Sequence, residues 1–351
     1  PVVNRREFIK VSTLLGAGAA GAPVFLGGCS RPSIPGSGEV RSTPTFCDGC
    51  FWKCAATVYQ EDGEAWTVEG NVDDLHSAGR LCTRGTAGLG MYEDRDRLRR
   101  PLLRVTGADG RQTFKEVSWE EALDFIAGGM KRIAANHGPD RVALLKHGYG
   151  GRHFAHLMHA FGSGSIAEPS FAQCRGPRDV GFSLTFGEDV GSPERTDMEH
   201  SRCIVLIGSH IGENLHNAQV QTFAEALRSD VDLITVDPRF SVAAGKSRHW
   251  LPIKPGTDVA LLLAWMHVLI NEGLCDNDYI ENYTVGFDQL AEHVQRYSPE
   301  WVFLETGIRP ELIRATAHIM ARNAPATLIH PGRHATWYGD DTQRSRAIAI
   351  L

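Results

Sequence analysis

Residues Cys203-Ile204-Val205-Leu206-Ile207-Gly208 form an uninterrupted apolar run that ends in glycine. A second apolar run, Leu233 to Val236, ends at Asp237-Pro238-Arg239, and a turn and a helix from Asn214 to Leu227 separate the two. Short apolar runs that alternate with a helix are typical of a βαβ unit, whose two strands lie in one parallel sheet. The sequence therefore predicts an α/β fold.

The same βαβ unit has the chemistry of a dinucleotide site. Gly208 and Gly212 would let backbone amides approach a pyrophosphate at the start of the helix, and Asp237 is able to accept hydrogen bonds from a guanine or a ribose. No G-x-G-x-x-G follows a strand, which disfavours a nicotinamide enzyme. We therefore expect a Rossmann-like dinucleotide cradle without the nicotinamide fingerprint.

Two further patterns extend the α/β interpretation. Pro255-Gly256-Thr257-Asp258 opens a helix whose apolar stretch is interrupted by His267 and is too short to cross a bilayer, so we expect a packed core helix. Ser118 and Glu121 form a capping box ahead of another helix. Residues 142–145 then predict a buried strand.

The first folded part is expected to be a small β-rich cap. Residues 56–59 and 65–68 are strand-like and flank Asp62-Gly63, which is a hairpin turn signal. Residues 31–45 are rich in Pro, Gly and Ser without apolar periodicity, so they predict a linker, with folding expected to start near Phe46. At the other end, a helical run stops at Leu351 without a cap, which leads us to expect a fragment cut in mid-domain.

Composition and charge exclude one class of partner. The chain has 351 residues with 42% hydrophobic and 22% charged content, which is ordinary for a folded protein large enough for more than one packed unit. Its net charge of −6 and the lack of a long Lys/Arg block give no basic face of the kind that neutralises phosphates. We therefore expect no nucleic acid partner.

The first thirty residues predict an export signal. Arg5 and Arg6 form a twin-arginine pair, and the mildly apolar run that follows, residues 11–28, is rich in Ala and Gly. A membrane anchor is the alternative, but these glycines and Pro23 lower both helicity and hydrophobicity. Twin-arginine export carries folded, usually cofactor-containing proteins, so we expect a periplasmic location or the outer face of the cytoplasmic membrane. Cys29 follows small residues, as at a lipoprotein cleavage site, which leaves a lipid anchor there as an alternative.

Four cysteines predict a metal centre. Cys47, Cys50 and Cys54 lie in one short loop and Cys82 follows at a distance, which supplies the four thiolates of a [4Fe–4S] cluster. Structural zinc is an alternative, although zinc ligands usually come in two close pairs. Disulfides are another alternative in an exported chain, although three cysteines so close together do not pair evenly.

At this point the residues resemble the molybdopterin oxidoreductase family, also called the dimethyl sulfoxide reductase family. The motifs that carry the resemblance are Phe46-Cys47-Asp48-Gly49-Cys50, Leu81-Cys82-Thr83-Arg84-Gly85, Val236-Asp237-Pro238-Arg239 and Lys254-Pro255-Gly256-Thr257-Asp258. The twin-arginine pair, Arg84 and the run Arg97-Leu98-Arg99-Arg100-Pro101-Leu102 are most similar to the branch of polysulfide, thiosulfate, tetrathionate and arsenate reductases.

The resemblance implies a molybdenum or tungsten bis(molybdopterin guanine dinucleotide) cofactor and two-electron chemistry on a small anionic sulfur compound or oxyanion. It also implies two partners, a ferredoxin-like iron–sulfur subunit and a quinone-reactive membrane anchor. Arg84 would lie between the cluster and the pterin, and the cofactor contacts would include Gly208, Asn214, Asp237, Arg239, Gly256 and Asp258. Each contact residue also has a simpler explanation in turn or cap chemistry, and Asp258 would serve as an N-cap.

Cys174 is the candidate ligand of the molybdenum. It ends a short segment that turns sharply at Arg175-Gly176-Pro177, where a thiolate is able to face a cavity and a neighbouring arginine favours the ionised form. The position matches the metal-ligand loop of the family. Cys203 opens an apolar strand and is expected to be a small buried hydrophobe, while Cys275 follows a helix in a polar turn.

His147 and Arg333 are the candidate substrate residues. Both lie in loops after strand-like runs, and similarity to the polysulfide reductase branch implies that they reach the substrate pocket. A fixed positive charge there would hold an anion, although surface exposure is the commoner state of such side chains.

The motifs together divide the chain. We expect a signal at 1–30, a linker at 31–45, an iron–sulfur domain at 46–102, the first part of an α/β domain at 103–180, a Rossmann-like molybdopterin-dinucleotide domain at 181–325 and a return to the first α/β domain at 326–351. The leading hypothesis is an oxidoreductase of the sulfur and oxyanion branch. The alternatives are a molybdenum-free scaffold or electron-transfer homologue, or an enzyme of the nitrate reductase or formate dehydrogenase type.

Overall fold

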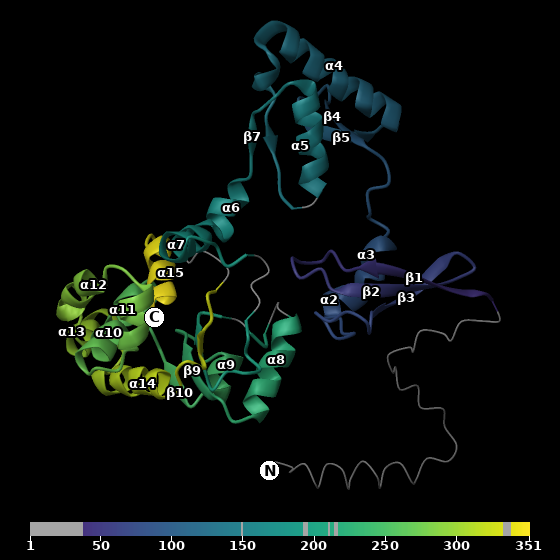
Figure 1. Ribbon diagram of the computed structural model, residues 1–351. Helices are drawn as coiled ribbons and strands as arrows, with labels where there is room; N and C mark the ends of the chain where they lie inside the picture. The colour runs from purple at the N-terminus through teal and green to yellow at the C-terminus, as the bar shows by residue number, and fades with distance from the viewer. Residues whose placement is uncertain (1–37, 149, 192–195, 210, 214–216, 333–337) are drawn as a thin grey trace, which may run out of the picture. The chain divides into compact units, whose positions relative to one another are not determined.

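A computed structural model describes residues 38–148, 150–191, 196–209, 211–213, 217–332 and 338–351 (Figure 1). The chain divides into two compact units, Pro1–Thr43 with Val58–Thr67 and Pro44–Thr57 with Val68–Leu351. The export signal, with Arg5, Arg6 and Cys29, lies outside the described residues.

A small N-terminal sheet has the strand order β1-β2-β3, with β1 (Val40–Phe46), β2 (Ala55–Glu61) and β3 (Glu64–Gly70). β2 and β3 flank Asp62-Gly63, and both turn residues have a positive φ, 51° and 86°, as the tightest hairpin turns require. The predicted hairpin is confirmed. The predicted linker is wrong for residues 40–45, because β1 begins at Val40; Pro44 is tolerated there because β1 is an edge strand.

A second region joins short strands and helices. Its elements are α2 (Thr83–Thr86), α3 (Gly88–Tyr92), β4 (Leu102–Thr106), β5 (Gln112–Glu116), α4 (Trp119–His137), η1 (Pro139–Arg141), β6 (Leu144–Leu145), α5 (Gly150–Phe161) and β7 (Ile166–Ala167). The capping box is confirmed, since the Ser118 hydroxyl accepts a hydrogen bond from the Glu121 amide at 3.0 Å. The buried strand expected at 142–145 is wrong: β6 pairs with β7 over two residues only, and Leu145 is 73% exposed. An apolar run in the sequence determines neither how many residues of a strand pair with a neighbour nor whether other elements bury that strand.

A four-stranded parallel sheet forms the centre of the next region. Its order is β10-β9-β8-β11, with β8 (Cys203–Ile207), β9 (Asp232–Val236), β10 (His249–Leu251) and β11 (Thr327–Ile329). Helix α8 (Asn217–Arg228) connects β8 to β9, which confirms the predicted βαβ unit. The chain leaves β8 toward β9 and β10 and returns on the other side as β11. This reversal creates a topological switch point at the carboxyl ends of β8 and β11, where ligands bind in open α/β sheets.

The core lies on both faces of this sheet because alternate residues of a strand point to opposite sides. On one face Val205 and Ile207 pack with helices α10 (Asp258–Asn271), α14 (Pro310–Arg322) and α15 (Asp341–Ile350). On the other face Ile204 and Leu206 pack with Phe223 of α8.

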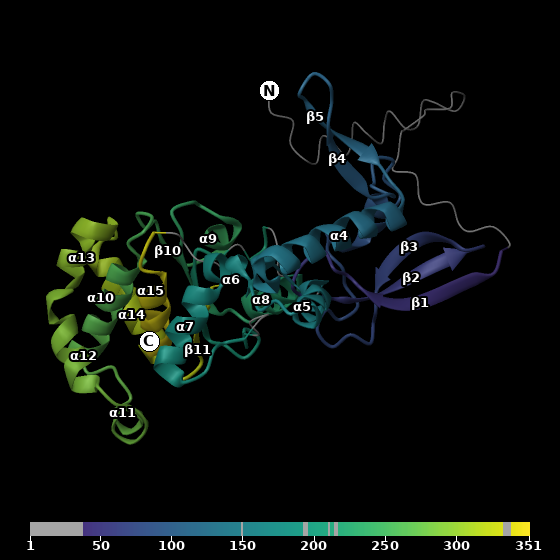
Figure 2. The ribbon, with the colours of Figure 1, turned by 90° about the horizontal axis from the view of Figure 1, so that it is seen from above.

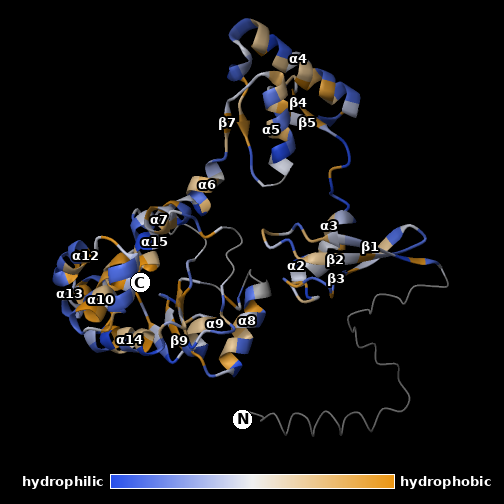
Figure 3. Cartoon of the chain, in the orientation of Figure 1, coloured by the Kyte–Doolittle hydropathy of each residue, from blue (hydrophilic) through white to orange (hydrophobic). Residues whose placement is uncertain are grey.

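Helix α10 is the core helix that the sequence predicts, and Figure 3 shows mostly hydrophobic residues along it. α10 packs against α13 (Pro299–Thr306), α14 and α15, and α10, α13 and α14 lie together in both Figure 1 and Figure 2. Trp265 is fully buried and donates a hydrogen bond from its Nε1 to the Thr316 hydroxyl at 2.9 Å. Within the described ranges, no helix combines the length and the hydrophobicity needed to cross a membrane.

The remaining elements are α6 (Pro169–Cys174), α7 (Gly176–Phe186), α9 (Val242–Lys246), α11 (Asn277–Tyr283), α12 (Phe287–His293) and η2 (Val294–Arg296). Helix α7 packs closely on α15, and Gly181 permits the approach. A Cβ atom at Gly181 would lie 2.6 Å from the Cβ of Ser345 and 2.8 Å from the carbonyl oxygen of Thr342.

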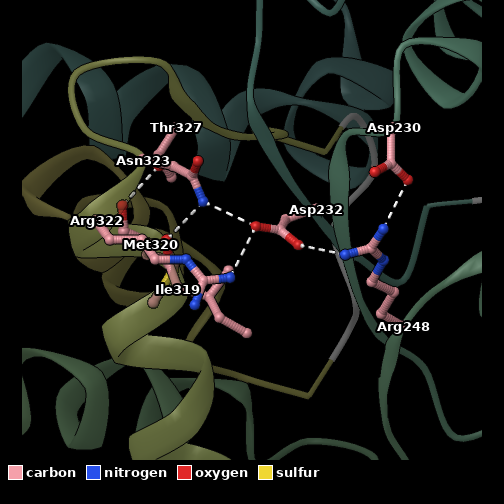
Figure 4. A network of polar contacts seen from close by, with 8 residues as sticks. All are labelled: Asp230, Asp232, Arg248, Ile319, Met320, Arg322, Asn323 and Thr327. Atoms are coloured by element: carbon pink, nitrogen blue, oxygen red, sulfur yellow. Dashed lines mark hydrogen bonds and ion pairs between the residues drawn. The ribbon is translucent and has the colours of Figure 1, made fainter.

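A network of charges closes the amino end of the parallel sheet (Figure 4). Asp232, the first residue of β9, accepts hydrogen bonds from Arg322 and Asn323 at 3.0 Å each and lies 3.5 Å from Arg248. Burial opposes ionisation of Asp232, but the hydrogen bonds from Arg322 and Asn323 hold its pKa below the ordinary value. This network is at the end of the sheet opposite to the switch point.

Candidate functional site

The cysteine triplet forms a closed loop after β1. The amide of Cys47 donates a hydrogen bond to the carbonyl oxygen of Cys54 at 2.8 Å, which joins the two ends of the loop. Cys54 and Trp52 are buried together, and Cys50 packs against them. Trp52 also stacks on His76 with a ring separation of 4.8 Å. The loop is therefore a fixed scaffold for three thiols.

A glycine contact brings the segment that follows the fourth cysteine, Cys82, to the triplet. Cys82 precedes α2, and its carbonyl oxygen accepts hydrogen bonds from the first turn of that helix. A Cβ atom at Gly85 would lie 3.4 Å from the Sγ of Cys47 and 3.2 Å from the Cβ of Leu81. Leu81 in turn packs against the buried pair Cys54 and Trp52. The structure thus brings the Cys82 segment to the triplet, as the motif predicts.

The thiols of this group differ in their electrostatics. Burial, together with the nearby Cys50, Asp74 and Cys47, raises the pKa of Cys54 to about 11. Burial would also raise the pKa of Cys82, but hydrogen bonds from the Gly85 amide and from Arg84 outweigh it and lower that pKa. Negative charges on Cys50 and Cys47 oppose the ionisation of Cys54. Several thiolates this close together would therefore need the positive charge of a bound metal.

The structure bears on the disulfide interpretation of the cysteines. All seven cysteines in the described ranges are free. Three thiols from one closed loop and a fourth from the segment that contacts it are the kind of ligand set that a [4Fe–4S] cluster takes.

Cys174 occupies the loop that the sequence predicts. It is the half-buried last residue of α6, and Arg175 separates it from α7. A Cβ atom at Gly176 would lie 2.8 Å from the carbonyl oxygen of Phe171, so glycine is required for the sharp turn. A role of Cys174 as a metal ligand stays a prediction.

The small parallel sheet brings charged side chains near this loop. Lys146 follows β6 and Glu168 follows β7, and their side chains form an ion pair at 2.7 Å. The hydrogen bond from Lys146, with further attraction from Lys146, His147 and Arg175, holds the pKa of Glu168 below its ordinary value. His147 is exposed and lies near this ion pair, and its role at the substrate stays a prediction. The sequence did not point to Lys146 or Glu168.

The carboxyl end of the larger sheet has the glycines expected of a cradle. Gly208 and Gly212 both have positive φ, 61° and 95°. Asp237 is buried, and its carboxylate accepts a hydrogen bond from the Arg239 amide at 2.8 Å. The Arg239 side chain donates to Glu213 at 3.1 Å. Asn214 and Arg333 lie outside the described residues.

The alternative explanation of Asp258, as the N-cap of its helix, is wrong. The N-cap is Thr257, and Asp258 is the first residue of α10. Its carboxylate instead lies 3.6 Å from the Nε of the buried Arg344 of α15. In the first turn of α10, its negative charge also interacts favourably with the positive end of the helix dipole. Gly256 has φ of 85°, and a Cβ atom there would lie 3.2 Å from the ring of Tyr338.

Family models match two parts of the chain. Residues 40–93 match the molybdopterin oxidoreductase Fe4S4 domain, and residues 97–350 match molybdopterin oxidoreductase. The chain belongs to the molybdopterin oxidoreductase family. Membership implies a molybdopterin cofactor and an Fe4S4 cluster, in agreement with the four cysteines and the switch-point glycines.

Relatives within the molybdopterin oxidoreductase family cover almost the whole chain. It is 30% identical to the molybdopterin-containing subunit of thiosulfate reductase from Salmonella typhimurium, over 99% of this chain and 46% of that protein. It is 28% identical to a dimethyl sulfoxide reductase from Escherichia coli, over 99% of this chain and 48% of that protein. The chain thus spans less than half the length of these relatives.

Among solved structures, the fold resembles acetylene hydratase from Pelobacter acetylenicus, with a TM-score of 0.71 and 28% identity. The match covers 88% of this chain and 42% of that protein. Since that relative is named as a hydratase, the likeness of fold by itself does not fix the reaction.

Two features of this family member had no signal in the sequence. His330 follows β11, is 2% exposed, and accepts a hydrogen bond from the Gly332 amide at 3.0 Å. Its ring nitrogens also lie 3.3 Å from Ser209, which follows β8, and 3.3 Å from Gln219 of α8, so it joins the strand ends at the switch point. The second feature is Arg178 with Asp179, both buried in α7.

Cys203 behaves as the sequence predicts. It is fully buried at the amino end of the inner strand β8, and burial, with the nearby Asp232, raises its pKa to about 12. Cys275 is half-buried after α10, and burial raises its pKa as well. A buried neutral thiol is unreactive, so among the cysteines of the described ranges that lie outside the cluster motif, Cys174 is the one placed at a turn beside charged groups.

Proposed function

We propose that this chain is part of the catalytic subunit of a molybdenum or tungsten oxidoreductase that transfers two electrons to or from a small sulfur compound or oxyanion. Polysulfide, thiosulfate, tetrathionate and arsenate are the substrate class. The observation that carries the proposal is the Cys174 loop, a thiol beside the charged group Lys146, His147, Glu168 and Arg175.

The cofactor in this proposal is bis(molybdopterin guanine dinucleotide), which supplies the centre at which the substrate gains or loses two electrons. Cys174 would give a soft thiolate ligand to its metal. Gly208, Asp237, Arg239 and Gly256 would hold the dinucleotide at the carboxyl end of the parallel sheet. Gly208 and Gly256 have positive φ and no Cβ atom, so a ligand is able to approach their backbone amides closely. Arg84, exposed beside Cys82, would lie between the cluster and the pterin.

The charges near Cys174 favour an anionic substrate. Lys146 is paired with Glu168, and Arg175, the residue after Cys174, is fixed in place by its ion pair with Asp179. A guanidinium fixed in place binds an oxyanion or a polysulfide with charge-assisted contacts. Arg333 would add a second cation.

The proposal extends to location and partners. The Arg5-Arg6 pair supports export by the twin-arginine route to the periplasm or the outer face of the membrane. A lipid anchor at Cys29 is an alternative way of holding the exported protein at the membrane. Electrons would reach the cluster from a ferredoxin-like subunit and a quinone-reactive membrane anchor.

The test is a dye-linked assay of the full-length protein with polysulfide, thiosulfate, tetrathionate, arsenate and nitrate as acceptors, and with formate as a donor. We expect turnover with one of the first four. Turnover with nitrate or formate alone would favour the alternative reaction type. A protein that holds the iron–sulfur cluster, lacks molybdenum and tungsten, and turns over none of these would be an electron-transfer or scaffold homologue.

A further inference from the structure

We propose that Arg178 and Asp179, adjacent residues of α7, are positioning residues for the Cys174 loop; this inference rests on the proposed function. Both residues are only 4% exposed. Arg178 donates two hydrogen bonds to Oδ1 of Asp179, from Nε at 3.2 Å and from Nη2 at 3.0 Å. A guanidinium and a carboxylate removed from water in this way hold one geometry, because separating them would leave a buried charge uncompensated.

Arg178 also ties α7 to two other segments. Its Nη1 donates to the carbonyl oxygen of Gly332 at 3.0 Å, and its Nη2 donates to the carbonyl oxygen of Gly191 at 2.7 Å. Gly332 belongs to the segment that follows β11 and His330. One buried side chain therefore connects α7, the Gly191 segment and the segment after β11.

Asp179 carries the same connection toward Cys174. Its Oδ2 lies 2.8 Å from Nη1 of Arg175, the residue directly after Cys174. The guanidinium of Arg175 also lies over the ring of Phe171, 5.4 Å from its centroid. Arg175 is thus held from α7 on one side and from α6 on the other, and the turn that contains Cys174 is fixed between these two contacts.

Asp179 lies between two guanidiniums. Its carboxylate contacts Arg175 at 2.8 Å and Arg178 at 3.0 Å. Lys146 and Glu168 form the neighbouring ion pair. The Arg175 guanidinium, fixed by Asp179 next to Cys174, is able to hold an anion near the loop.

A matched control exists at the opposite end of the sheet. Asp232 is likewise a carboxylate shared by two arginines, with Arg322 at 3.0 Å and Arg248 at 3.5 Å (Figure 4). If Asp179 only stabilises the fold, then Asp232→Asn and Asp179→Asn should have the same effects on Cys174. If Asp179 positions the loop, only Asp179→Asn should alter that cysteine.

The experiment uses the full-length protein and two measurements. In cofactor-free protein, labelling of Cys174 by iodoacetamide is followed by peptide mass spectrometry, and Asp179→Asn is expected to speed it about 10-fold because the loop loses the ion pair between Arg175 and Asp179 and opens more often. In the cofactor-loaded protein, Asp179→Asn is expected to lower turnover about 10- to 100-fold and to shift the paramagnetic signal of molybdenum, with the iron–sulfur signal unchanged.

A second variant protects the test against misfolding. Arg178→Met with Asp179→Asn removes both buried charges and leaves none unpaired within the pair, so it is expected to fold and to give the same faster labelling. Unchanged labelling of Cys174 in both variants, or equal acceleration in Asp232→Asn, would overturn the positioning role. Faster labelling in a protein that never binds molybdenum or tungsten would support the positioning role and contradict the proposed function instead.

Discussion

Replacing Cys174 and Cys203 separately by alanine distinguishes a metal ligand from a packing residue. Cys203 is accessible to neither solvent nor reagent. It is 0% exposed and belongs to β8, which lies between strands β9 and β11. Its loss removes one sulfur from a packed sheet and should cost about 1 kcal/mol, or a fall in Tm of roughly 2–4 °C. Turnover should stay at the level of the parent protein.

Cys174 should give the opposite pattern. It is half-buried at the end of a six-residue helix, so its loss should cost less than about 1 kcal/mol of folding free energy. Because a thiolate on the metal sets its charge and coordination, turnover should fall by at least about 100-fold.

The assay compares both variants as full-length proteins with a reduced dye and the acceptor that the parent protein uses. Tm reports folding, and the paramagnetic signal of the reduced iron–sulfur cluster reports damage elsewhere. Normal turnover and normal metal content in Cys174→Ala would refute its assignment as the ligand. An equal loss in both variants would indicate general damage and would refute the reasoning from burial.

The other predictions concern the cluster, the α7–α15 contact, acid stability and export. Cys50→Ser should abolish the paramagnetic signal of the reduced cluster, because one of four thiolates is lost; a retained signal would exclude Cys50 as a ligand. Gly181→Val should lower the free energy of unfolding by about 1–3 kcal/mol, since even a Cβ would lie 2.6 Å from the Cβ of Ser345, whereas Gly150→Ala, with nothing within 4 Å, should not destabilise. Arg322 and Asn323 hold the pKa of Asp232 below its ordinary value of 3.8 despite burial, so this carboxylate stabilises the fold above pH 3.8 and the stabilisation is lost as pH falls through the lower folded pKa. Asp232→Asn should therefore remove this part of the acid transition in urea titrations at different pH values. An unchanged pH profile would contradict the prediction. Arg5→Lys with Arg6→Lys should leave folded precursor in the cytoplasm, and an unchanged periplasmic yield on cell fractionation would argue against the twin-arginine route.

Local patterns in the sequence predicted the elements whose environment they determine. The run Cys203–Ile207 is buried on both faces of a parallel sheet, and such burial selects continuous apolar residues. Asp62-Gly63 and the Ser118 capping box succeeded because turn and cap chemistry depend on neighbours within a few residues.

Features that depend on distant contacts escaped the sequence. Residues 142–145 gave a two-residue strand, because its length depends on the equally short β7. The strand β1 was hidden by Pro44, which only an edge position permits. The simpler explanation of Asp258, as a helix cap, is wrong because Asp258 pairs with Arg344, 86 positions away in the chain.

The candidate site shows the same division. The cysteine motif and the Cys174 turn are local, so sequence alone identified their residues. Lys146 with Glu168, and Arg178 with Gly332, are separated by 22 and 154 positions. No periodicity links residues so far apart, and only the fold brings these charges to the loop.

Metal analysis of the purified full-length protein tests the central claim most directly. The account predicts about four iron atoms per chain from one [4Fe–4S] cluster, together with molybdenum or tungsten in stoichiometric amount. Iron without either metal would remove the catalytic centre from the account. One zinc and no iron would contradict the assignment of Cys47, Cys50, Cys54 and Cys82 and with it the whole interpretation.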